Sequence, residues 1–137
     1  MKKLQFTSIK ETCLYVKNLE NTRSFYHDTL GLEIISYSLE NHIFFRAGRS
    51  VLLCFNPEKS KNKTHIPPHF GNGNLHFAFE VTSLNYDASL RFIKNTGIKI
   101  EHEEIWNNKT RSFYFRDPDN NCVEIIEEGM WEKKINE

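Results

Sequence analysis

The sequence predicts an α+β protein of two βαβββ modules, which together form a curved eight-stranded sheet shaped like a cup, with the helices outside. Three observations support this prediction. The chain of 137 residues has the size of one ordinary domain. Short segments follow the order strand, helix and three strands, and the same order then occurs again. We expect a single domain over residues 1–137, with a first module at about 8–56, a loop at about 57–73 and a second module at about 74–128.

The first module begins with the alternating segment 11–16, which is rich in strand formers. Asn18 predicts a helix N-cap, apolar residues recur at helical spacing over 19–30, and Gly31 ends the helix. Three short apolar segments follow, each bounded by polar residues or Gly, and each predicts a strand. These segments are 32–37, 42–47 and 50–55.

The second module begins after residues 56–74, which are mostly Lys, Asn, Pro and Gly and predict a connecting loop. Residues 75–81 predict a strand, Ser83 an N-cap, 84–95 a helix and Gly97 its end. Three more strands are expected near 98–103, 111–116 and 121–127.

The two modules resemble copies of one unit, because matching residues keep a constant spacing. Val16, Asn18, Leu19 and Phe25 match Val81, Ser83, Leu84 and Leu90, each displaced by 65. The pair Phe45-Arg46 recurs as Phe115-Arg116, displaced by 70. An internal repeat explains this better than chance agreement among common apolar residues, although identities are few.

The repeat brings four equivalent positions together, and three of them carry metal-binding side chains. His76 on the first strand of the second module corresponds to Glu11, and Glu124 on its last strand corresponds to Leu53. Three ligands beside an apolar corner leave positions open for water or substrate, as catalytic metal sites require. We therefore expect one divalent metal ion bound by Glu11, His76 and Glu124.

Each of these residues also has a purely structural interpretation. Glu11 alone is typical of an exposed carboxylate at a strand start, and His76 alone of a hydrogen-bonded core histidine. Glu124 lies in an apolar strand, where a carboxylate needs a cation or strong hydrogen bonds. The three residues together favour the metal site.

Three stretches of the chain carry a family resemblance. They are Glu11 to Leu19 with Phe25-Tyr26 and Leu30-Gly31-Leu32, then Leu75 to Val81, and Arg111 to Glu124 with its Asp117-Pro118-Asp119 turn. Together they resemble the vicinal oxygen chelate superfamily, which includes glyoxalases, bleomycin-resistance proteins and extradiol dioxygenases. The resemblance implies the cup-shaped fold, and it implies metal ligands at Glu11, His76 and Glu124.

This resemblance leads us to expect a divalent-metal-dependent enzyme that acts on a small oxygen-chelating substrate, as a lyase, isomerase or transferase. The metal is expected to be Zn, Mn, Fe, Ni or Co. Glu124 and Tyr114 are expected to serve catalysis. Substrate binding is expected from Arg46, Ser112, Phe55 and Trp106.

The alternative is a metal-free protein that sequesters a small toxic compound in an aromatic cleft, as bleomycin-resistance proteins do. The chain retains the metal-ligand set, which pure sequestering proteins generally lack, so the enzyme is the favoured interpretation.

Charge and composition restrict the classes of partner that the protein is expected to bind. Lys plus Arg and Asp plus Glu both number 18, so no long-range field would concentrate nucleic acid or an anionic membrane. No segment approaches the roughly 20 apolar residues of a membrane span, and the start of the chain has no signal-peptide pattern. We expect a cytoplasmic homodimer with a small-molecule substrate, in which Cys13, Cys54 and Cys122 are reduced buried thiols.

Overall fold

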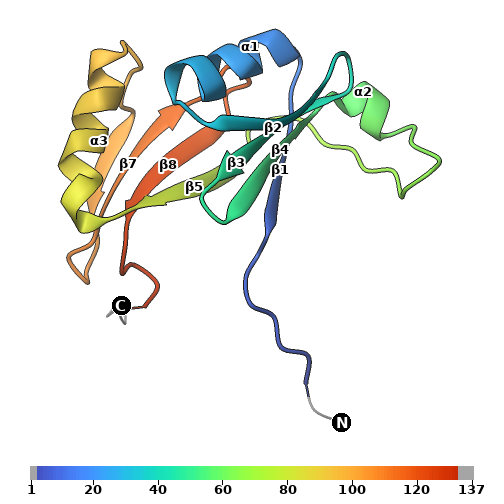
Figure 1. The fold of residues 1–137 in the computed structure, drawn as a ribbon. Helices are drawn as coiled ribbons and strands as arrows, with labels where there is room; N and C mark the ends of the chain where they lie inside the picture. Colours follow the sequence, from blue (N-terminus) through green and yellow to red (C-terminus); the bar gives the residue numbers. More distant parts are fainter. Residues whose placement is uncertain (1–2, 133–137) are drawn as a thin grey trace. The chain divides into compact units, whose positions relative to one another are not determined.

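The structure, a computed structural model, describes residues 3–132. The chain divides into two compact units between Asn72 and Gly73. Each unit contains one four-stranded mixed sheet and its own helices (Figure 1). The predicted α+β fold of two βαβββ modules is therefore confirmed, and backbone hydrogen bonds organise the strands as two sheets of four.

The first unit follows the predicted element order. Its elements are β1 (Glu11–Tyr15), α1 (Leu19–Arg23), the π-helical segment η1 (Ser24–Thr29), β2 (Glu33–Ser38), β3 (His42–Ala47), β4 (Ser50–Phe55) and α2 (Pro57–Ser60). The sheet order is β1-β4-β3-β2, with β1 parallel to β4 and the other pairs antiparallel.

The helix expected over 19–30 is α-helical only in its first part. The side-chain oxygen of Asn18 accepts a hydrogen bond from the Asn21 amide at 2.9 Å, so the predicted N-cap is confirmed. From Ser24 the helix widens into η1, a form with one more residue per hydrogen-bonded turn. Tyr26 in η1 is fully buried, with its ring 5.6 Å from that of Phe45. Gly31 then adopts φ +82°, which ends the helix.

The second unit repeats this plan. Its elements are β5 (His76–Val81), α3 (Ser83–Asn95), β6 (His102–Ile105), β7 (Arg111–Arg116) and β8 (Cys122–Glu127). The sheet order is β5-β8-β7-β6, again with the first pair parallel. The α3 face of this sheet buries Phe113, Phe115, Val123 and Ile125, and Tyr86 and Ile93 of α3 are buried with them.

Three predicted details were wrong. The N-cap of α3 is Thr82 and not Ser83, because the Thr82 hydroxyl accepts from the Asn85 amide at 3.3 Å. The strand expected at 98–103 lies at His102–Ile105, where it pairs with β7. The loop after β4 begins with the one-turn helix α2, whose first turn is capped by Asn56.

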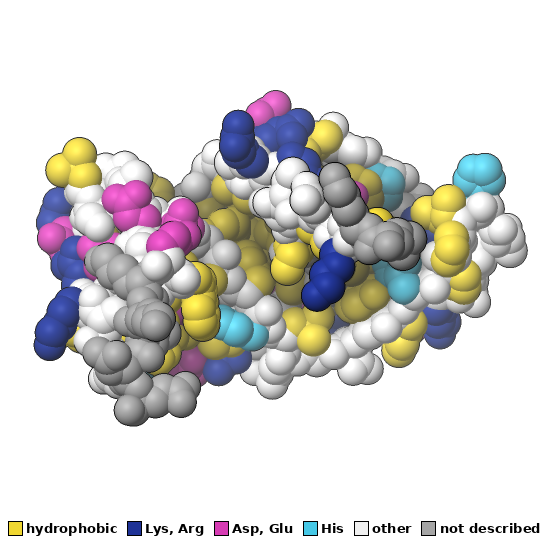
Figure 2. Space-filling model, turned by 90° about the horizontal axis from the view of Figure 1, so that it is seen from below, with side chains coloured by type: hydrophobic (Ala, Val, Ile, Leu, Met, Phe, Trp, Pro, Cys, Tyr) yellow, Lys and Arg dark blue, Asp and Glu magenta, His cyan; other side chains and the backbone are white. Residues whose placement is uncertain are grey.

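Figure 2 shows acidic and basic side chains intermixed over the α3 side of the second unit. No helix in the described part of the chain has the length and apolar character needed to cross a membrane.

All three cysteines are free, as expected, but only Cys54 is buried, while Cys13 and Cys122 are half-buried.

Candidate functional site

Strand pairing inside each unit supports the positions that the repeat assigns. Cys13 of β1 pairs with Leu53, and Ala78 of β5 pairs with Glu124. Cys13 and Ala78 are 65 residues apart, so their partners Leu53 and Glu124 occupy equivalent positions in the two sheets. The register thus gives Leu53 and Glu124 the correspondence that the sequence predicts.

His76 and Glu124 form the centre of the site in the second unit. They lie on adjacent parallel strands, with Nε2 of His76 3.3 Å from Oε1 of Glu124. Glu124 is only 6% exposed, whereas the His76 side chain is more than half exposed. The other ring nitrogen of His76, Nδ1, donates to the backbone carbonyl of Cys122 at 2.9 Å. This hydrogen bond fixes the ring and leaves Nε2 facing the carboxylate.

This pair fits a divalent metal ion. With Nδ1 as the donor to Cys122, a neutral imidazole presents the lone pair of Nε2 to a carboxylate oxygen. Nε2 of His76 and Oε1 of Glu124 would then be two hydrogen-bond acceptors 3.3 Å apart, which repel each other. The pair therefore needs a positive charge, either a second ring proton or a metal ion. Imidazole nitrogen and carboxylate oxygen are ligands that Zn, Mn, Fe, Ni and Co all accept. Within the described residues of the second unit, no third His, Cys, Asp or Glu completes a group of three ligands.

Tyr114 lies beside the carboxylate, because β7 pairs it directly with Glu124. Burial raises the pKa of Tyr114 to about 12, and the charge of Glu124 and a hydrogen bond to it act in the same direction. The phenol is therefore protonated at neutral pH and is a hydrogen-bond donor, not a base.

Ser112 and Trp106 support Tyr114 from the same strand and the adjoining turn. The indole Nε1 of Trp106 donates to the Ser112 hydroxyl at 3.0 Å. Ser112 is completely buried and lies on the same face of β7 as Tyr114, which pairs with Glu124 of β8. Ser112, Tyr114 and Glu124 therefore share one face of the sheet.

The remaining predicted site residues belong to the first unit. Glu11 is exposed at the start of β1, and Arg46 is exposed on β3 opposite Glu33. Phe55 is buried, and its ring contacts that of His69 at 4.6 Å between centres. The structure thus brings together the predicted residues of the second unit and places Glu11, Arg46 and Phe55 in the first.

Sequence reasoning missed His102 and Glu104, which lie on the same face of β6. His102 pairs with Tyr114 across the strands, with its ring centre 5.9 Å away, and its Nε2 lies 2.7 Å from Oε2 of Glu104. The strand expected at 98–103 included His102 but not Glu104, and its register with β7, which is what places His102 beside Tyr114, could not be predicted from the sequence. Alternation along the observed strand would have placed His102 on the face of Tyr114.

The chain matches the glyoxalase-like domain family over residues 9–130. The protein belongs to this family. A crystal structure of lactoylglutathione lyase from Agrobacterium tumefaciens is similar to it, with 34% identity, 93% of this chain and 98% of that chain covered, and a TM-score of 0.88. The resemblance to the vicinal oxygen chelate superfamily is thus confirmed.

Two more distant structures share the fold. A genomically encoded fosfomycin resistance protein from Listeria monocytogenes has 24% identity, 95% of this chain and 100% of that chain covered, and a TM-score of 0.67. A virulence protein from Salmonella typhimurium has 23% identity, coverage of 90% and 98%, and a TM-score of 0.71. At these identities the likeness concerns the fold alone.

Proposed function

We propose that this glyoxalase-like protein is a divalent-metal-dependent enzyme that acts on a small substrate with two neighbouring oxygens. The proposed ligands are Glu11, His76 and Glu124. The observation that supports the proposal best is the pairing of His76 Nε2 with Glu124 Oε1 at 3.3 Å, because the hydrogen bond to Cys122 leaves that nitrogen as a free ligand.

The residues around the pair have distinct proposed roles. A bound Zn, Mn, Fe, Ni or Co ion would polarise the chelating oxygens of a substrate. Tyr114, which is protonated and pairs across the strands with Glu124, is the proposed hydrogen-bond donor that orients the carboxylate. Glu124 or Glu11 is the proposed proton acceptor when it is released from its role as a ligand. Trp106 and Phe55 offer apolar contact to the substrate, and Arg46 offers a positive charge.

The reaction to assay first follows from the most informative relative. The protein from Agrobacterium tumefaciens is named a lactoylglutathione lyase and shares 34% identity with this chain. We therefore propose a lyase or isomerase reaction of the glyoxalase type, catalysed by a homodimer in the cytoplasm.

The decisive experiment measures metal content by inductively coupled plasma spectrometry after reconstitution and dialysis. We expect about one ion per chain, since the repeat gives three ligands per site. His76→Ala and Glu124→Gln should each weaken metal affinity by more than about a hundredfold. The matched controls are His65→Ala and Glu132→Gln, which change exposed residues of the same types. Sub-stoichiometric metal under every reconstitution condition would contradict the proposal.

A second function, metal-free sequestration of a planar compound, is favoured by aromatic side chains on one face of the first unit. The rings of His42 and Phe44 stack at 4.0 Å, and Lys63 lies over the ring of Phe55 at 4.9 Å. If this function holds, chelator-treated protein should quench the fluorescence of a planar aromatic dye and Phe44→Ala should remove the effect. Equal quenching by the variant would exclude this face as the binding site.

A further inference from the structure

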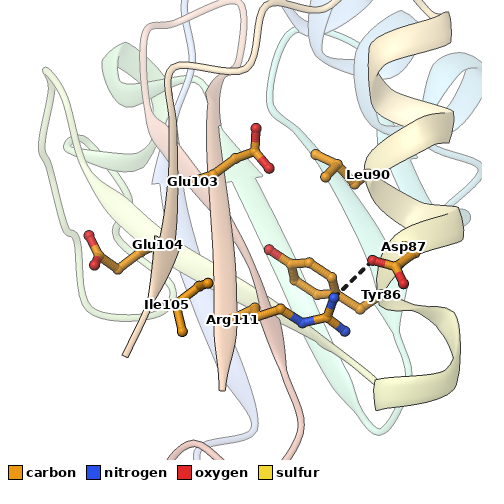
Figure 3. Close-up of a pocket in the computed structure, with 7 residues that line it drawn as sticks. All are labelled: Tyr86, Asp87, Leu90, Glu103, Glu104, Ile105 and Arg111. Carbon is orange, nitrogen blue, oxygen red and sulfur yellow. Dashed lines mark hydrogen bonds and ion pairs between the residues drawn. The ribbon is translucent and has the colours of Figure 1, made fainter. Parts of the chain in front are cut away.

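A cavity lies on the α3 side of the second unit, away from His76 and Glu124. Its volume is about 230 Å³ (Figure 3). It lies between α3 and strands β6 and β7, and its wall includes Tyr86, Leu90, Glu103, Ile105 and Arg111. Because side chains alternate along a strand, Arg111 and Glu103 project to the opposite face from Tyr114 and His102. The cavity is thus separate from the proposed metal site.

Tyr86 supplies the first indication that the cavity binds something. It is 3% exposed, and its hydroxyl points into the cavity toward Glu103 (Figure 3). Within the described residues, this hydroxyl has no hydrogen-bond partner. Burial raises the pKa of Tyr86 to about 12, so the group stays neutral and can both donate and accept. The hydroxyl is open to the cavity, so a ligand with a donor group can reach it and hydrogen-bond to it.

The charges around the cavity favour a cation. Arg111 lies over the Tyr86 ring at 4.2 Å, but its guanidinium is already paired with Asp87 at 2.9 Å and with Glu127 at 2.9 Å. Glu103 lies 3.6 Å from the ammonium of Lys94, beyond a good hydrogen bond. The carboxylates are those of Asp87, Glu127 and Glu103, and the cations are Arg111 and Lys94. The groups around the cavity therefore carry one net negative charge.

The walls favour an organic ion over a metal ion. The Tyr86 ring, Leu90 and Ile105 line the cavity with apolar surface beside the single carboxylate of Glu103. Glu104 points away from this group (Figure 3) and pairs with His102. A metal ion would need several oxygen ligands together, whereas an alkylammonium ion needs one carboxylate, one acceptor and apolar contact for its chain.

We propose that this cavity is a binding site for a small alkylammonium ion, whose ammonium group donates to the Tyr86 hydroxyl and the Glu103 carboxylate while its alkyl chain lies against Leu90 and Ile105. The site requires neither the metal nor the substrate of the proposed enzyme.

Three probes of the same shape test the charge preference. n-Butylammonium, 1-butanol and butanoate are titrated separately into the full-length protein at neutral pH, and amide chemical shifts are followed by NMR. We expect saturable shifts in α3, β6 and β7 with butylammonium, binding about tenfold weaker with butanol, and no binding with butanoate. Equal binding of all three probes, or no saturable shift with butylammonium, would overturn the proposal.

Two variants test the contacts. Tyr86→Phe and Glu103→Gln preserve shape and should each weaken butylammonium binding about tenfold, because each removes one acceptor. Glu132→Gln, an exposed carboxylate in the same unit, is the control for the loss of charge and should leave binding unchanged. Leu90→Trp should fill the cavity and abolish binding, with folding checked by thermal melting. Unchanged affinity in both Tyr86→Phe and Glu103→Gln would show that butylammonium binds elsewhere.

Discussion

Glu124 and Glu127 are two buried carboxylates on one strand, and each is held by a different kind of partner. Glu127 is 7% exposed and faces α3, where Arg111 supplies a protein cation at 2.9 Å. Glu124 is 6% exposed on the other face, where its partner is the imidazole of His76. A buried carboxylate needs a positive charge nearby, and for Glu127 the protein itself provides that charge through Arg111. Only Glu124 has a partner that a metal ion can share.

Glu127 should make stability depend on pH. Hydrogen bonds from Arg111 hold the pKa of Glu127 below its usual value, although burial opposes them. A lowered folded-state pKa stabilises the fold above the unfolded-state pKa, and this contribution disappears as the pH falls through the folded-state value. Glu127→Gln should therefore cost about 2 kcal/mol in the free energy of unfolding at pH 7 and much less at pH 3.

Urea unfolding of wild type and variant at both pH values measures this difference. Glu132→Gln is the control and should change stability little at either pH, because that carboxylate is exposed. An equal loss at pH 3 and pH 7 would mean that Glu127 acts through packing and not through its charge.

At the scale of the elements, the sequence predicted most strands because their apolar pattern is local. The bounds of β3, β4 and β7 agree with the expected segments. Strand β6 was misplaced because His102–Ile105 is mostly charged and its position depends on pairing with β7, which is not a local property. The change from α1 to η1 likewise has no signal in residue spacing.

Part of the candidate site was likewise predictable from the sequence, and part was not. The internal repeat predicted His76 and Glu124 as ligands; the structure places their side chains 3.3 Å apart, and their role as ligands stays a prediction. The Cys122 carbonyl that orients His76 was not predictable, because backbone groups carry no residue-specific signal. The cavity at Tyr86 was also missed, since it depends on how α3 packs against β6 and β7.

The equivalence of Leu53 and Glu124 gives a prediction about strand β4. Leu53 is half-buried between the buried residues Leu52 and Cys54, so it projects from the sheet face opposite to theirs. If that face lines the metal site, Leu53→Glu adds a fourth ligand and should tighten metal binding at least about tenfold. Metal titration with a competing chelator measures the change.

Leu53→Gln is the matched control, because it is polar and similar in size but a poor metal ligand. It should fold as well as Leu53→Glu without the gain in affinity. Unfolding of both variants would instead place Leu53 in a core.

At the scale of the whole molecule, we expect a homodimer in which each site takes Glu11 from one subunit and His76 with Glu124 from the other. Each four-stranded sheet has edge strands whose unpaired backbone groups favour pairing or cover. A two-fold partner is the commonest way to provide such cover.

Subunit mixing tests this arrangement. Glu11→Ala and His76→Ala proteins are mildly unfolded together and refolded, and metal per mixed dimer is measured. Shared sites should give one intact site per mixed dimer, because one subunit contributes Glu11 and the other contributes the remaining ligands. The control is each variant refolded alone, which should bind no metal. No recovery in mixed dimers of proven composition would mean that each chain builds its own site.

The segment between α2 and β5 has a consequence for how the chain tolerates cutting and insertion. Most of its side chains are exposed, including Lys61, although Tyr15 bonds to His69 at 2.8 Å and ties part of it to β1. The residues between Phe70 and Leu75 have no strand partner. Every strand pair of the first sheet comes before this segment in the chain, and every strand pair of the second sheet comes after it. Between the two sheets, trypsin should cut at Lys61 or Lys63 and leave each fragment with a complete sheet. The same place suits new chain ends, so a circular permutant that begins at Gly73 keeps every strand pair of the native protein.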